Sequence, residues 1–103
     1  MIKVSVLYAN TEGNKFDWDY YSSKHIPLLK QLLGAACKRV EVDQGLAGGQ
    51  PSSKAPFVAL AHMFFDSVES FQQAFGPHAG TIMSDVSNYT DIQPIVQINA
   101  VRM

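Results

Sequence analysis

The chain has 103 residues, a formal net charge of −1 and a single cysteine. This length fits one domain with one hydrophobic core, and the near-neutral charge argues against a nucleic-acid partner. Because one cysteine cannot form an internal disulfide and no apolar run approaches the ~20 residues that span a bilayer, we expect a soluble, cytoplasmic protein with no membrane partner.

The first half of the chain predicts a strand over residues 2–8 and a helix over residues 16–33. Every second residue of the strand segment is apolar, which is typical of a half-buried strand. The helix segment has apolar residues at helical spacing, but Pro27 lacks an N–H group and crowds the preceding turn. We therefore expect a kink beside His25 and a helix end at Gly34.

The second half predicts two strands over residues 37–46 and 56–65, joined by a loop over residues 48–54 that is rich in glycine and serine. Asp66 fits the N-cap of the next helix, with Glu69 three residues on, and Gly76-Pro77 separates that helix from a shorter one. A last strand is expected over residues 92–101. Cys37, with small apolar neighbours, is expected to be a core residue.

The order strand, helix, strand, strand, helix, strand predicts an α+β, ferredoxin-like βαββαβ domain over residues 1–103, with an antiparallel four-stranded sheet and helices on one face only. Alternation then leaves a second, open face that mixes apolar and polar side chains. This mixture suits coverage by a second sheet across a cavity, so we expect a homodimer through the sheet faces. The open face would hold Leu60, His62, Phe64, Ile95, Gln97 and Asn99.

Five motifs are distributed along the chain: Asp17-x-Asp19-Tyr20-Tyr21-x-x-Lys24-His25-x-Pro27-Leu28, the segment 41–49, Phe64-Phe65-Asp66-Ser67, Phe75-Gly76-Pro77-His78-Ala79 and Asn88-Tyr89-Thr90-Asp91-Ile92-Gln93-Pro94. Together they resemble the EthD family over nearly the whole chain. The name of that family derives from a gene cluster for ethyl tert-butyl ether degradation. The resemblance implies a dimeric α/β barrel, an architecture shared by isomerases, polyketide cyclases, cofactor-free monooxygenases and haem-binding enzymes, so it implies the fold more than a reaction.

His25 is the main candidate for chemistry, because an imidazole titrates near pH ~6.5 and acts as acid or base without a cofactor. It corresponds to the histidine of the family motif. Tyr21, one turn earlier, is its expected partner, and Asp91 either orients His25 or caps the last strand. The alternative is that His25 forms a hydrogen bond that only secures the kink at Pro27.

The expected substrate pocket adds Tyr20, His62, Phe64 and Gln97. The alternative for His62 is that its ring is partly buried and only forms a hydrogen bond with Gln97 or Asn99. His78 is expected to be exposed, because it lies in the first turn of a helix.

No cofactor and no metal are expected, because the histidines have no ligand spacing. The leading hypothesis is a protein that binds a small organic molecule in a cavity between helices and sheet, as a cofactor-independent isomerase, cyclase or monooxygenase. The rivals are a non-catalytic binding or accessory protein of a catabolic pathway and a haem binder.

Overall fold

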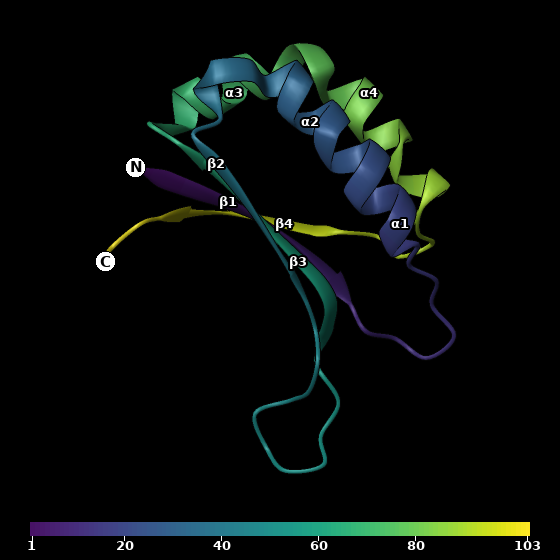
Figure 1. Cartoon of the computed structure of the whole chain (residues 1–103). Coiled ribbons are helices and arrows are strands. Elements are labelled where there is room, and N and C mark those ends of the chain that lie inside the picture. The colour runs from purple at the N-terminus through teal and green to yellow at the C-terminus, as the bar shows by residue number, and fades with distance from the viewer.

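The computed structural model describes residues 1–103 and contains one antiparallel sheet of four strands in the order β2-β3-β1-β4. Figure 1 shows every helix on one side of this sheet. This architecture confirms the predicted ferredoxin-like α+β fold. The strands are β1 (Ile2–Ala9), β2 (Arg39–Gln44), β3 (Phe57–Phe65) and β4 (Ile95–Ala100).

The register of the strands separates the two faces of the sheet as the alternation predicted. Val4 of β1 lies opposite Met63 and faces the helices, whereas Ser5 lies opposite His62 and faces away from them. Val4 and Met63 are buried by the helix layer. Ile95 and its neighbours on β4 stay exposed, because β4 is an edge strand.

The first helix is continuous in sequence, and the disturbance that Pro27 predicted beside His25 takes the form of a π-helical turn. It runs through α1 (Trp18–Tyr20), a π-helical turn (Tyr21–His25) and α2 (Ile26–Leu33). A π turn is wider than an α turn, so it accommodates the missing N–H group and the ring of the proline that follows it. Gly34 ends the helix with a φ of 64°, a conformation that favours glycine.

The second helical stretch contains α3 (Val68–Phe75), a 3₁₀ turn (Gly76–His78), α4 (Ala79–Ser84) and a second 3₁₀ turn (Val86–Asn88). Ser67 is the N-cap of α3, since its side chain accepts a hydrogen bond from the Ser70 N–H at 3.0 Å, which corrects the prediction of Asp66. Asp66 instead forms an exposed ion pair with Lys38.

Two predicted strands are shorter in the structure. β2 begins at Arg39 and not at Cys37, which packs against the core from the preceding turn. β4 begins at Ile95 and not at Ile92, because Pro94 has no N–H group to donate to a strand ladder. The loop between β2 and β3 projects beyond the sheet (Figure 1). None of the helices is long and apolar enough to cross a membrane.

The core between the helices and the sheet consists of two clusters of different composition. We call the first the apolar cluster and the second the tyrosine cluster. The apolar cluster lies under α2, α3 and α4, and the tyrosine cluster lies where β1 meets the π turn. The apolar cluster contains Val4, Leu29, Leu33, Met63, Phe65, Phe71 and Ile82. The tyrosine cluster contains Tyr8, Tyr21, Ala59, Tyr89 and Ile92.

Candidate functional site

A cavity of about 300 Å³ lies between the helix layer and the sheet. Its volume is at the lower end of the range for small-molecule sites. Val4 and Met63 of the sheet and Leu29 of α2 belong to its almost entirely apolar wall. The wall residues with an O–H or ring N–H group are Tyr8, Tyr21 and His25. Polar chemistry within the cavity is therefore confined to the end where these three residues lie.

The π turn determines how His25 reaches this cavity. At this turn the N–H group of Ile26 donates to the carbonyl of Tyr21, five residues back. The imidazole is only 4% exposed and stacks on the ring of Tyr21, with centroids 5.5 Å apart and planes at 17°. Tyr21 and His25 are therefore in contact through stacked rings, and a catalytic role for Tyr21 stays a prediction.

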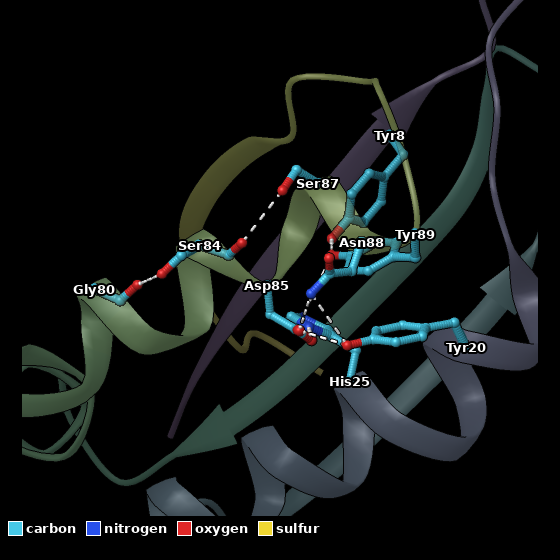
Figure 2. A network of polar contacts seen from close by, with 9 residues as sticks. All are labelled: Tyr8, Tyr20, His25, Gly80, Ser84, Asp85, Ser87, Asn88 and Tyr89. Atoms are coloured by element: carbon cyan, nitrogen blue, oxygen red, sulfur yellow. Dashed lines mark hydrogen bonds and ion pairs between the residues drawn. The ribbon is translucent and has the colours of Figure 1, made fainter.

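Asp85, just after α4, holds one side of the imidazole (Figure 2). Its Oδ2 accepts from Nδ1 of His25 at 2.9 Å, while its Oδ1 accepts from the hydroxyl of Tyr20 at 2.6 Å and from the amide of Asn88 at 2.9 Å. Burial by itself raises the pKa of the Asp85 carboxyl, but the hydrogen bonds from Tyr20, His25 and Asn88 outweigh it and lower the pKa below its usual value. Asp85 is therefore a carboxylate.

Two tyrosines lie on the other side of the imidazole. The hydroxyl of Tyr89 is 3.3 Å from Nε2 of His25 and 2.6 Å from the hydroxyl of Tyr8. Because Nδ1 donates to the Asp85 carboxylate, Nε2 of the neutral ring is an acceptor. Burial raises the pKa of both Tyr8 and Tyr89, so these phenols stay protonated.

The carboxylate beside His25 is Asp85 and not Asp91. Asp91 is exposed, and its Oδ1 accepts from the backbone N–H of Lys15 at 2.9 Å. This finding corrects the prediction that Asp91 orients the imidazole and agrees with its alternative role in securing the backbone. No pattern in the sequence distinguishes Asp85 from an ordinary surface residue at a helix end, so sequence reasoning missed it.

His62, Phe64 and Gln97 belong to the open face of the sheet. Nδ1 of His62 is bonded to the Ser5 hydroxyl at 2.8 Å, and the ring of Phe64 is covered by Arg39 at 4.2 Å. These side chains do not line the cavity that holds His25. The prediction that these three residues line the substrate pocket is therefore corrected, because the cavity lies between the helices and the sheet, on the opposite side of the sheet from them.

Tyr20 and His78 also lie outside the cavity wall. Tyr20 supports the site from outside, through its hydrogen bond to Asp85 and the stacking of its ring on Tyr89, and the hydrogen bond raises the pKa of the Tyr20 hydroxyl. His78 is half-buried in the 3₁₀ turn before α4, rather than exposed as expected. No group of three or more His, Cys, Asp or Glu side chains has an arrangement that would hold a metal ion.

The chain is similar to known proteins over most of its length. Residues 12–93 match the family model of the EthD domain. An uncharacterised 11.0 kDa protein from the thcB-thcC intergenic region of Rhodococcus erythropolis is 32% identical over 91 residues, which are 86% of this chain and 84% of the relative.

Solved structures support the same assignment. The crystal structure of an EthD-like protein from Ralstonia eutropha JMP134 superposes with a TM-score of 0.94 at 43% identity, over 99% of this chain and 92% of that protein. A dimeric protein of unknown function with a ferredoxin-like fold, from Bacteroides fragilis, superposes with a TM-score of 0.58 at 10% identity, over 97% of this chain and 95% of that protein. The second likeness concerns the fold alone.

Proposed function

This chain belongs to the EthD family, and we propose that it binds a small, apolar organic molecule in the cavity between its helices and its sheet, where His25 acts as an acid or a base. The single observation that carries this proposal is the position of His25. Among the residues that line an otherwise apolar cavity, it is the one whose side chain carries both a ring N–H donor and a basic ring nitrogen.

The contacts of His25 suit acid–base chemistry. When the ring takes up a proton from a substrate, the carboxylate of Asp85, 2.9 Å from Nδ1, stabilises the imidazolium. Tyr20 and Asn88 hold that carboxylate in place from its other oxygen. A positioned acid or base contributes a rate factor of roughly 10²–10⁴. Such a factor suits the isomerisation, cyclisation or cofactor-independent oxygenation of a substrate that is already activated.

Turnover by matched variants tests this function. A panel of lactones, quinols and β-dicarbonyl compounds is screened with the wild type, His25→Ala and His78→Gln. His78 is the matched control, since it lies outside the cavity wall. We expect turnover of at least one compound, a loss of roughly 10²-fold or more in His25→Ala and no loss in His78→Gln. Equal rates in the wild type and His25→Ala would rule out the acid–base role.

One observation favours a second candidate, a non-catalytic binding protein. Both ring nitrogens of His25 already have hydrogen-bond partners, Asp85 and Tyr89, as expected for a residue that only secures the helix. Ligand-induced thermal shifts without turnover, retained in His25→Gln, would support this candidate. These two hydrogen bonds also argue against a haem bound through His25, because neither ring nitrogen is free to bind an iron.

We also propose that the chain forms a homodimer through the open face of the sheet. Ile95 is 52% exposed on this face, and the structure from Bacteroides fragilis with the same fold is dimeric. A partner sheet would cover the exposed apolar side chains. Sedimentation analysis should show a dimer for the wild type and for Thr81→Glu on α4, but a monomer for Ile95→Glu. A monomeric wild type would contradict the proposal.

A further inference from the structure

We propose that the hydroxyl of Tyr8 is the group that contacts the substrate oxygen, and that Tyr8 and Tyr89 form a hydrogen-bonded relay between the substrate and His25. This inference rests on the proposed function, because it names the contact residue and the substrate class of the same cavity. Tyr8 then acts as a catalytic residue, while Tyr89 and Asp85 are positioning residues that act through their neighbours.

The surroundings of His25 leave a substrate little direct access to its nitrogens. Nδ1 is bonded to Asp85 at 2.9 Å and Nε2 lies 3.3 Å from the Tyr89 hydroxyl. The ring itself is stacked against Tyr21 and packs against Tyr89, with centroids 4.6 Å apart in the second pair. A proton that passes between substrate and His25 therefore has a ready route through the hydroxyl of Tyr89.

Tyr89 does not line the cavity, whereas its neighbour Tyr8 does. The 2.6 Å bond between their hydroxyls connects the cavity wall to Nε2 of His25. Figure 2 shows Tyr8, Tyr89 and His25 leading from β1 towards Asp85. Tyr21 also lines the cavity, but it contacts His25 through ring stacking. Tyr8 is therefore the wall residue whose hydroxyl is bonded to this chain of polar groups, with the Tyr21 hydroxyl as its second polar neighbour.

The protonation state of His25 sets the direction of the relay. With a neutral ring, Tyr89 donates to Nε2 and Tyr8 donates to Tyr89, so the Tyr8 oxygen is left as an acceptor for a substrate O–H group. With a protonated ring, Nε2–H donates to Tyr89, Tyr89 donates to Tyr8, and Tyr8 donates to a substrate carbonyl or enolate.

The proton balance of the relay is complete within these groups. As a base, the site takes one proton from the substrate onto Tyr8 while Tyr8 passes its own to Tyr89 and Tyr89 passes its own to His25. As an acid, it runs the same steps in reverse. Burial raises the pKa of both phenols, so neither holds a charge, and the positive charge rests on His25 beside the Asp85 carboxylate.

The cavity wall also defines the class of substrate. It contains no lysine, arginine, aspartate or glutamate, so a charged group such as a carboxylate or phosphate would be buried without a partner. The polar groups lie at the tyrosine end. The site therefore fits a neutral, ring-sized apolar molecule with one phenol, enol or ketone oxygen.

Two probes that differ in one oxygen test the contact of Tyr8. Calorimetry compares the affinity of the protein for 2-naphthol with its affinity for naphthalene, which has the same rings but no hydroxyl. We expect wild type to bind 2-naphthol about two- to tenfold more tightly, the effect of one hydrogen bond, and Tyr8→Phe to lose this preference while it keeps its affinity for naphthalene. A preference that persists in Tyr8→Phe would overturn the contact but leave the binding function intact. Failure of both probes to bind wild type would overturn the function and the inference together.

The pH dependence of a ketone probe tests the relay. 1-Tetralone only accepts hydrogen bonds, so we expect wild type to bind it about two- to tenfold more tightly at pH 5 than at pH 8, because Tyr8 donates to it only when His25 is protonated, and a lower pH favours that form. Tyr89→Phe keeps the ring but removes the connecting hydroxyl, and should bind 1-tetralone equally at both pH values. A pH dependence that survives in Tyr89→Phe, or its absence from wild type, would overturn the relay.

Discussion

The apolar cluster and the tyrosine cluster fill the same layer of the molecule but differ in chemistry. The apolar cluster has no side-chain hydrogen-bonding groups beyond the Met63 sulfur, so its packing depends on shape and on removal of apolar surface from water. The tyrosine cluster buries the hydroxyls of Tyr8 and Tyr89, which bond to each other and lead to His25. The cavity is lined by both clusters. Under the proposed function, the first cluster mainly stabilises the fold and the second mainly serves the chemistry.

The largest effect on stability should come from the apolar cluster. Phe65 is completely buried, so Phe65→Ala removes a large apolar side chain and leaves a void. We expect a loss of about 3–5 kcal/mol in the free energy of unfolding, measured by urea denaturation. A loss below about 1 kcal/mol would show that this cluster does not support the fold as described.

A smaller effect is expected from Asp85, which holds His25 on the side away from the tyrosine cluster. Asp85→Ala leaves the buried Nδ1–H of His25 without its acceptor, at a cost of about 1–3 kcal/mol in unfolding free energy. The stronger effect should fall on catalysis, because the imidazolium loses its counter-charge. Unchanged turnover in Asp85→Ala would rule out a role for Asp85 in stabilising the imidazolium.

The N-cap of α3 provides a comparison outside both clusters. Ser67→Ala removes the acceptor of the Ser70 N–H, and we expect a loss of about 1 kcal/mol in unfolding free energy. The preference for 2-naphthol over naphthalene should stay at its wild-type value, because Ser67 does not line the cavity. A changed preference would mean that cavity binding depends on general stability and not on the tyrosine cluster.

The smallest expected effect is the loss of stability at acid pH that arises from Asp85. Because the folded state lowers the pKa of Asp85 relative to the unfolded chain, this residue contributes stability that is present above about pH 4 and is lost as pH falls through the lower, folded pKa. Thermal unfolding from pH 7 to pH 2 should therefore show a steeper acid loss in the wild type than in Asp85→Asn. Parallel curves would contradict the lowered pKa.

The sequence predicted the parts of this account that depend on local patterns. Alternation along β3 was enough to separate Met63 from His62, and the motif around His25 identified the imidazole. Alternation does not report how closely helices approach a sheet, so it could not show that the cavity between them excludes His62 and Gln97 of the open face. Pro27 signals a disturbed helix, but a kink and a π turn satisfy the same local constraint. Asp85 joins His25 across 60 residues of sequence, a contact that only the tertiary fold creates.

The most direct test of the central claim is a crystal structure of the protein soaked with 2-naphthol. The account predicts the probe in the cavity between helices and sheet, with its oxygen within hydrogen-bond distance of the Tyr8 hydroxyl and its rings against the apolar cluster. A probe bound instead on the open face of the sheet, beside His62, would contradict the account.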